Sequence, residues 1–459
     1  MKLVDNETAQ KFFEGEHVDG LEPFFTYLTP EEEHEKAQTF CNFLMRTKAQ
    51  CTDSTIAVTY DCNLQCPYCY EIWAKNPNMK MAMDKYKVDK AFEALEHLNT
   101  SCTSKKPLTL TGGEPLMKKN KEIVKYILKK GTNLGYTFAI FTNGVELHHF
   151  LNDFSGIDID YIQVTLDGPR SLHNERRVFN KGNPTFDTIV SNIEKARKLE
   201  LPLVIRTNTD PEILDRIDEL AAFFKKRGWD HDPHIMFSLV YVCDQRLNPD
   251  AVEQQLKVYQ EIVTAATRAD LQFLEVAPFV KLGSLWTNHP RFWPSFWNCK
   301  AVVNRYVFDP FGDVYPCRAM LGWKEERIGV YTPELQFNEK LQKWRKRTIF
   351  NMGKCTECDV ALVCGGSCGY ASLLNKKDLF TPVCQDIEKI VVPYLEYKYK
   401  GGIHMLPKVH SQVLIREEPD ETYVIHMGTG KMYKFNQTAI AMLKACQEGI
   451  TKSELIQRL

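Results

Sequence analysis

From about residue 55, six short apolar runs alternate with six longer amphipathic segments, and this alternation constrains the fold more than any other feature. The apolar runs predict strands at residues 56–60, 108–111, 138–142, 161–166, 203–208 and 234–242. The amphipathic segments predict helices at about 83–99, 119–133, 145–152, 184–199, 211–227 and 250–269. In the fourth helix, Val190, Ile193 and Ala196 lie on one helical face. Strands that alternate with helices form parallel sheets with crossover helices. We therefore predict an α/β fold, either an open or closed barrel or a doubly wound sheet, with sites at the C-terminal strand ends.

The pattern differs before and after these repeats. Residues 1–50 form a polar lead-in, with a helix predicted from residue 30 to about 47. Between about 285 and 395, cysteine, glycine and aromatic residues become prominent and the periodicity fades, which is typical of a segment that folds around metal. After residue 407, three strands (412–417, 422–426 and 432–435), a turn at 428–430 and two helices (437–447 and 451–459) predict a small β-then-α module. We expect four parts, at residues 1–50, 51–285, 286–397 and 408–459.

The charge balance and the apolar runs exclude some classes of protein. The chain has 58 basic and 59 acidic residues, so it gives no support for a nucleic-acid partner. No apolar run is long enough for a transmembrane helix, and the N-terminal residues lead into no secretory signal. We therefore expect a cytoplasmic protein without a membrane partner. In that reducing compartment, clusters among the 15 cysteines are more often metal ligands or redox groups than disulfides.

Three cysteines directly follow the first predicted strand. Cys62, Cys66 and Cys69 have the spacing C-x3-C-x2-C, and no fourth cysteine or histidine lies nearby in the sequence. Thiolates suit zinc or iron–sulfur clusters. Structural zinc almost always takes four protein ligands, whereas a four-iron cluster on three thiolates keeps one iron open. A zinc knuckle or packed thiols are the alternatives.

The C-x3-C-x-aromatic-C pattern resembles the signature of the radical S-adenosylmethionine (SAM) enzymes. The resemblance implies a partial (β/α)6 barrel and a [4Fe–4S] cluster whose open iron is chelated by SAM. It also implies an electron donor such as flavodoxin or ferredoxin. One electron from the cluster would cleave SAM to methionine and a 5′-deoxyadenosyl radical, so the cofactor carries the hard chemistry.

Further motifs at the strand ends resemble the SAM-binding residues of that family. Gly112, Gly113 and Glu114, in a Gly-Gly-Glu-Pro segment, resemble its site for the methionine amine. The resemblance places Tyr68 near the adenine and gives Asn143 and Thr165 polar contacts to SAM. Arg177 would hold the SAM carboxylate, which a guanidinium binds in bidentate fashion. Taken alone, the Gly-Gly-Glu-Pro segment is more often a structural turn, and an arginine such as Arg177 is more often part of a surface ion pair.

Seven further cysteines lie near the C-terminal end, with a specific spacing that resembles the SPASM extension of radical SAM enzymes that mature peptides and proteins. The resemblance implies two auxiliary [4Fe–4S] clusters, and hence three clusters in all. The ligands of the first would be Cys299, Cys317 and Cys368. The ligands of the second would be Cys355, Cys358, Cys364 and Cys384. A zinc ribbon is the alternative, since C-x2-C pairs also suit zinc.

Two positions depart from the family pattern. Some relatives supply a fourth ligand to the first auxiliary cluster six residues before its first cysteine, and that residue is Trp293 here. We therefore predict an open iron that binds a substrate thiolate, unless Cys243 or another group closes it. Sulfatase-maturing relatives carry an aspartate base directly after the second SPASM cysteine, where this chain has Arg318, so sulfatase maturation is the less favoured activity.

The remaining five cysteines have no motif, and we expect them to be small buried hydrophobes: Cys41, Cys51, Cys102, Cys243 and Cys446.

The C-terminal module resembles the winged-helix-like elements that bind leader segments of ribosomally made, modified peptides. In those elements a leader adds as a strand to an exposed sheet edge; a structural cap is the alternative. The resemblances together predict a peptide maturase that installs a crosslink, most simply a Cys thioether, in a precursor peptide. A carbon–carbon crosslink or another oxidation is the second reading, and a zinc-binding peptide-recognition scaffold is the third. The sequence identifies no catalytic acid or base.

Overall fold

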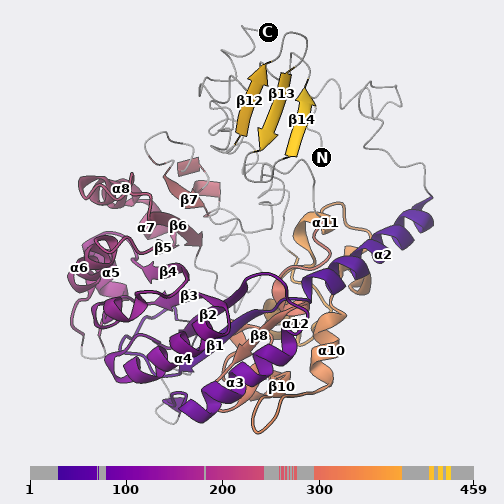
Figure 1. The fold of residues 1–459 in the computed structure, drawn as a ribbon, viewed down its shortest axis with the longest axis horizontal. Coiled ribbons are helices and arrows are strands. Elements are labelled where there is room, and N and C mark those ends of the chain that lie inside the picture. The colour runs from indigo at the N-terminus through magenta and orange to yellow at the C-terminus, as the bar shows by residue number, and fades with distance from the viewer. Residues whose placement is uncertain are drawn as a thin grey trace.

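The computed structural model describes residues 29–69, 71, 79–179, 182–241 and 294–384, parts of 258–276, and the backbone of three strands between 413 and 435. Its centre is an 11-stranded sheet with the order β11-β10-β9-β8-β1-β2-β3-β4-β5-β6-β7 (Figure 1). The strands that the repeats predict are β1 (Asp53–Thr59), β2 (Lys106–Gly112), β3 (Tyr136–Thr142), β4 (Ile159–Thr165), β5 (Leu203–Thr209) and β6 (Ile235–Tyr241). Each pairs in parallel with its neighbour in that series. The predicted α/β fold with a parallel sheet is confirmed, and its arrangement is that of a partial barrel.

Most predicted crossover helices form. They are α3 (Lys85–Leu98), α4 (Lys121–Asn133), α5 (Arg170–Arg176), α6 (Phe186–Arg197), α7 (Pro211–Leu214) and α8 (Ile217–Lys226). The predicted single helix at 211–227 is wrong, because α7 ends where the Arg216 amide bonds to the carbonyl of Ile213, and α8 then begins anew. The predicted helix at 250–269 lies mostly outside the described residues.

The helix predicted at 145–152 is also wrong. Two short 3-10 helices stand there, η5 (Leu147–His149) and η6 (Leu151–Phe154). Their buried side chains are Leu147, Phe150, Leu151 and Phe154. Apolar residues spaced by three or four fit the three-residue turn of a 3-10 helix as well as the turn of an α-helix. The segment divides into two elements because 3-10 helices seldom exceed four residues.

One face of the sheet packs against the helices. A Cβ at Gly131 of α4 would lie 2.5 Å from the ring of Phe138, so this β3 side chain points into the helical layer. In the same way Val164 of β4 lies within 2.6 Å of the Cβ position of Gly144, beside Ile189 of α6. The predicted face of the fourth helix is also confirmed, since its three apolar residues are at most 4% exposed. Because strand side chains alternate, residues of the opposite parity line the other, inner face.

The cysteine-rich segment extends this sheet, which its fading periodicity did not predict. Strand β8 (Arg305–Phe308) pairs in parallel with β1, and β9 (Asp313–Tyr315), β10 (Gly329–Val330) and β11 (Gln336–Phe337) continue antiparallel (Figure 1). At the other end β7 (Leu274–Val276) pairs in parallel with β6. Short helices complete the segment: α10 (Glu339–Arg345), α11 (Ala361–Cys364) and α12 (Gly369–Lys376), with 3-10 helices that include η9 (Lys300–Val302) and η10 (Arg318–Met320).

Buried hydrogen bonds connect this segment to the first strand. Asp309, which is fully buried in the turn between β8 and β9, accepts a hydrogen bond of 3.0 Å from the hydroxyl of Tyr60, directly after β1. The same carboxylate accepts from the amides of Phe311 and Asp313 at 2.9 and 2.8 Å. These bonds fix the β8–β9 hairpin against the loop that carries the first cysteines.

Both ends of the chain contain elements that the sequence predicts. Helix α2 (Pro30–Lys48) begins with a capping box in which the Thr29 hydroxyl and the Glu32 carboxylate bond each other's backbone amides. The strands β12 (Val413–Glu417), β13 (Thr422–His426) and β14 (Lys431–Phe435) form an antiparallel sheet, which confirms the three predicted strands. The turn at 428–430 and the helices at 437–447 and 451–459 lie outside the described residues. No helix in the described part of the chain is long and apolar enough to span a membrane.

Two cysteines without a motif form a disulfide, so the expectation that they are free buried thiols is wrong. Cys51 and Cys102 are bonded, with Cα atoms 4.8 Å apart. They lie just before β1 and β2, and parallel pairing places the starts of these two strands side by side. Cys41 is 2% exposed, as expected. Cys243 and Cys446 lie outside the described residues.

Candidate functional site

The first three cysteines lie together at the C-terminal end of β1. Burial raises the pKa of Cys62, and the nearby Glu114, Cys66 and Cys69 raise it further. Burial likewise raises the pKa of Cys69 to about 11, with smaller contributions from Glu71 and Cys66. Cys66 is buried, and Cys62 and Cys69 are half-buried. The structure therefore brings together the residues that the sequence proposes as ligands of the SAM-binding cluster.

The glycine pair at the end of β2 holds this cysteine loop. Gly112 has a φ of +126°, and a Cβ on it would lie 2.2 Å from the carbonyl oxygen of Thr59. A Cβ on Gly113 would lie 2.3 Å from the carbonyl oxygen of Asp61. The amides of Gly113 and Glu114 donate to those same two oxygens, each at 2.8 Å. Glycine is required here because only a residue without a side chain permits this approach.

Glu114 joins the ends of β2 and β3. Its carboxylate is 2% exposed and accepts hydrogen bonds from the Thr142 hydroxyl (2.6 Å), the Asn143 amide (2.6 Å) and the Leu116 amide (2.9 Å). Burial raises its pKa to about 7, although these hydrogen bonds act in the opposite direction. A carboxylate whose ionisation is penalised by burial is stabilised by a positively charged group beside it. The side chain of Asn143 in turn donates to Asn63 Oδ1 at 2.7 Å, within the cysteine loop.

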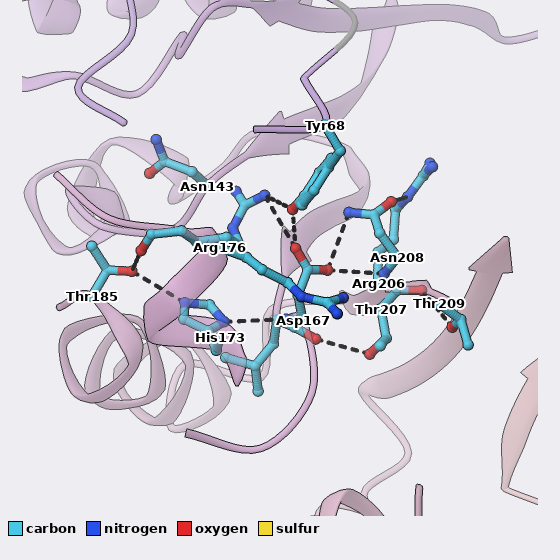
Figure 2. A network of polar contacts seen from close by, with 12 residues as sticks. Tyr68, Asn143, Asp167, His173, Arg176, Thr185, Arg206, Thr207, Asn208 and Thr209 are labelled. Carbon is cyan, nitrogen blue, oxygen red and sulfur yellow. Dashed lines mark hydrogen bonds and ion pairs between the residues drawn. The ribbon is translucent and has the colours of Figure 1, made fainter. Parts of the chain in front are cut away.

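Tyr68 and Arg177 meet at a third residue, Asp167, as Figure 2 shows for Tyr68 and Asp167. The Tyr68 hydroxyl donates to Asp167 Oδ2 and accepts from Arg177 at 2.7 Å. Arg177 and Asp167 form an ion pair at 3.5 Å, with side chains 8% and 0% exposed. The buried Nε of Arg177 has no hydrogen-bond partner among the described residues. Thr165, the last residue of β4, is 9% exposed.

Sequence reasoning missed Asp167 and Asn208 as members of this network. Asp167 Oδ1 accepts from the Asn208 backbone amide at 2.9 Å and from its side-chain amide at 3.1 Å. The Asp167 amide donates to His173 Nδ1 at 3.1 Å (Figure 2). Burial, and to a lesser extent Arg177, lowers the pKa of His173, so this imidazole is neutral and its Nε2 bears the hydrogen that faces Thr185. The available signal was position, since Asp167 follows β4 and Asn208 lies near the end of β5.

The seven C-terminal cysteines form two groups. Burial raises the pKa of Cys317 to about 12, and Cys368 and Cys299 raise it further. In the second group, burial raises the pKa of Cys355 to about 11, with contributions from Cys364, Cys384 and Cys358. The two groups have the membership that the sequence proposes, and ligation itself remains a proposal.

A buried arginine lies near both groups. Arg347 is 1% exposed and donates to four oxygen acceptors, namely the carbonyls of Leu379, Ser367 and Gly366 and the hydroxyl of Ser372. Burial lowers its pKa, and the thiols of both auxiliary groups, led by Cys368 and Cys299, act to raise it. One guanidinium therefore orders the backbone around both groups of cysteines.

The donor sets consist of thiols, which are the groups that bind iron–sulfur clusters in proteins. Among the described residues, no three His, Cys, Asp or Glu side chains converge closely enough to hold one metal ion. The thiols nevertheless form three separate groups, and within each group neighbouring thiols raise one another's pKa. A cluster takes its protein thiolates on separate irons and so needs no convergence on one point.

Comparisons with known proteins find one matching family model and several relatives. Residues 56–224 match the family model of the Radical SAM superfamily. A cysteine-type anaerobic sulfatase-maturating enzyme of Clostridium novyi (strain NT) is 25% identical over 333 residues, which cover 67% of this chain and 85% of that protein. A probable GTP 3′,8-cyclase of Archaeoglobus fulgidus is 28% identical over 38% of this chain and 54% of its own length.

Two solved structures share the fold. Native anSMEcpe with bound AdoMet and Cp18Cys peptide has a TM-score of 0.56 at 15% identity, covering 76% of this chain and 96% of that one. Streptococcus suis SuiB bound to the precursor peptide SuiA has a TM-score of 0.53 at 15% identity, covering 82% of this chain and 87% of that one. At these identities the likeness concerns the fold.

Proposed function

Because this chain carries a radical SAM domain over residues 56–224, we propose that it is an enzyme that crosslinks a ribosomally made precursor peptide, most simply through a Cys thioether. The observation that carries this proposal is the position of the first auxiliary group. Cys299 and Cys317 flank the β8–β9 hairpin, and β8 pairs with β1, the strand that leads to Cys62. A peptide on the inner face of the sheet would therefore lie between the SAM-binding cysteines and a second cluster.

Family membership implies SAM and a [4Fe–4S] cluster on Cys62, Cys66 and Cys69, which together supply the one-electron cleavage of SAM. We assign the SAM contacts to the chain's own residues. Glu114 would accept from the methionine ammonium, which would favour the ionised carboxylate that burial penalises. Arg177 would bind the SAM carboxylate, since its buried Nε–H has no partner among the described residues.

Five further residues complete the proposed SAM site. Gly112 and Gly113 would let the backbone approach the ligand, while Tyr68, Asn143 and Thr165 would line it. Asp167 would act as a positioning residue that orients Tyr68 and Arg177, since it contacts both side chains. Among the residues that the structure describes, none stands out as a general acid or base, and we assign none.

The composition of the first auxiliary group supports the proposal of a thioether. Three thiols, Cys299, Cys317 and Cys368, interact there, and no fourth cysteine joins them in the described part of the chain. Trp293 and Cys243 lie outside the described residues. A three-thiolate [4Fe–4S] cluster would keep one iron for the substrate thiolate, which is a good iron ligand. The second auxiliary cluster, on Cys355, Cys358, Cys364 and Cys384, would bring the total to three.

Two comparisons with the relatives shape the proposal. The Clostridium novyi relative is a sulfatase-maturating enzyme. Such enzymes carry an aspartate base at the position that Arg318 occupies in this chain. SuiB was solved with a precursor peptide, and this supports a peptide with a leader segment as the substrate. The sheet β12–β14 would take that leader as an added strand. A flavodoxin or ferredoxin would supply electrons.

The decisive experiment is anaerobic reconstitution, followed by iron, sulfide and zinc analysis and incubation with SAM, dithionite and a Cys-containing precursor peptide encoded beside the gene. We expect three four-iron clusters, 5′-deoxyadenosine, and a peptide that loses two hydrogens and one free thiol. A two-hydrogen loss with the thiol intact would identify a carbon–carbon crosslink instead. Stoichiometric zinc without 5′-deoxyadenosine would refute the enzyme and favour the zinc-binding scaffold.

Two further measurements separate the parts of the proposal. Addition of the Cys peptide should change the spectrum of the first auxiliary cluster, and a Ser-for-Cys peptide should not. Deletion of residues 408–459 should weaken leader binding without a change in iron content. Unchanged leader affinity in the deletion variant would show that the C-terminal module is a structural cap.

A further inference from the structure

The inner face of the sheet is a polar and partly open surface. In β4 to β6, most side chains that point toward the helices are buried, whereas those of opposite parity, apart from Thr165, are half-buried or exposed. The inner-face residues of β3 to β6 include Phe141, Tyr161, Gln163, Val204, Arg206 and Met236. Met236 is 51% exposed, although its strand β6 is flanked by β5 and β7. A face that mixes aromatic, polar and flexible apolar side chains is typical of a binding site.

Arg318 reaches this inner face from the auxiliary segment. It begins the 3-10 helix η10 directly after Cys317. Its guanidinium carbon lies 4.6 Å from the centre of the Phe141 ring, and that ring is 6.2 Å from the ring of Tyr161. Burial raises the pKa of Tyr161, and the positive charge of Arg318 opposes that shift. Arg318 therefore lies beside both β3 and β4, within the space that the peptide would occupy.

The stacked arginine retains its hydrogen-bonding edge. A guanidinium that stacks on an aromatic ring still directs its N–H donors outward in its own plane. Among the described residues, Arg318 makes no ion pair. Arg318 helps to lower the pKa of Asp53. That carboxylate is already bound by Arg305 at 2.6 Å and lies 3.4 Å from Lys300. The fixed charge at this point of the inner face is therefore positive.

We propose that Arg318 binds a carboxylate of the peptide and so selects a substrate with an acidic group close to its reacting cysteine. This inference rests on the proposed function. The planar fork of arginine matches a carboxylate with two parallel hydrogen bonds, which a thiolate or a backbone carbonyl does not offer. Because Arg318 directly follows Cys317, the bound carboxylate lies near the first auxiliary group. The carboxylate comes from an Asp or Glu side chain or from the C-terminus of the peptide.

Fluorescence anisotropy with the full-length, reconstituted protein tests this assignment. Three probes are fluorescein-labelled peptides with one cysteine and an amidated C-terminus. They carry Asp, Asn or Lys at the position next to that cysteine. A fourth probe has Asn and a free C-terminal carboxylate. We expect the Asp peptide to bind about tenfold more tightly than the Asn peptide, as for loss of one charge-assisted hydrogen-bonded pair. Equal or tighter binding of the fourth probe relative to the Asp probe would identify the C-terminus as the source.

Variants connect the preference to one side chain. Arg318→Gln should remove the difference between Asp and Asn peptides, Arg318→Lys should retain part of it, and Arg318→Glu should prefer the Lys peptide. Arg216→Gln, in an exposed ion pair with Glu219 on the helical layer, is the matched control and should leave the preference intact. An unchanged preference in Arg318→Gln, or no preference in the wild-type protein, overturns the proposal.

The test separates this inference from the proposed function. Formation of 5′-deoxyadenosine by the wild-type protein with SAM and dithionite reports the function and does not depend on the peptide charge. If that product forms but the Asp preference is absent, only the role of Arg318 fails. Melting temperatures show whether all variants are folded. If Arg318→Gln is less stable, the contact is still detected by tighter binding of the Lys peptide to Arg318→Glu.

Discussion

Asp167→Asn is the substitution that tests the buried network most directly. Asn has the shape of Asp and still accepts from the Asn208 amide through one oxygen, but it removes the negative charge beside Arg177. The side chains of Asp167 and Arg177 are 0% and 8% exposed, so solvent screens their ion pair weakly. The substitution thus leaves a buried guanidinium with the Tyr68 hydroxyl as its remaining close partner in the network.

The expected magnitude follows from burial. Removal of one partner of a buried ion pair costs about 3–5 kcal/mol, because the other charge stays buried and uncompensated. The retained hydrogen bonds to Asn208 favour the lower end, about 3 kcal/mol. For a domain of this size that corresponds to a fall in melting temperature of roughly 6–12 °C. Asp187→Asn, in an exposed pair with Arg170 whose side chains are 61% and 63% exposed, should cost less than about 1 kcal/mol.

The assay is urea unfolding of the full chain under anaerobic conditions, followed by circular dichroism. The double variant Asp167→Asn/Arg177→Met removes both charges and should recover much of the loss, since replacement of a whole buried pair is often nearly neutral. The reasoning is refuted if Asp167→Asn costs no more than the Asp187→Asn control, or if the losses of Asp167→Asn and Arg177→Met simply add in the double variant.

Three further predictions concern other contacts. Gly113→Ala places a methyl group 2.3 Å from the carbonyl of Asp61, so iron retention by the first cysteine group should fall; iron content equal to that of wild type would contradict it. Asp309 has a pKa raised to about 7 by burial, so its protonated form stabilises the fold below its unfolded pKa of about 4, and this contribution is lost as the pH rises through 7. Asp309→Asn should therefore gain stability relative to wild type between pH 4 and 8, by urea midpoints, and parallel pH profiles would exclude this assignment. Arg347→Met leaves four oxygen acceptors without their donor and should speed limited proteolysis of residues 366–379, whereas an unchanged cleavage rate would show that the backbone there does not depend on the guanidinium.

Much of the fold follows from local patterns in the sequence. Each of the six predicted strands is present, because short apolar runs that alternate with helical segments are typical of the strands of a parallel sheet covered by helices. The errors are also local in origin. The helix predicted at 145–152 is two 3-10 helices, since a run of apolar residues spaced by three or four does not by itself distinguish these helix types.

Some contacts depend on pairings between distant segments, for which a single sequence carries no signal. The disulfide between Cys51 and Cys102 forms because the parallel pairing of β1 and β2 aligns the starts of both strands. Asp167 follows β4 directly in the sequence, but its contact with Asn208 required the pairing of β4 with β5.

The sequence by itself predicted the ten motif cysteines, and its resemblance to radical SAM enzymes with a SPASM extension implied their division into three groups, because the spacing of motif residues is visible along the chain. Only the tertiary structure decided what lies between those groups. The pairing of β8 with β1 brings the segment that contains Arg318 beside Phe141, 177 positions earlier in the chain (318 − 141). Long-range strand pairing depends on the packing of the whole sheet, and this is why the charge on the inner face became visible only in three dimensions.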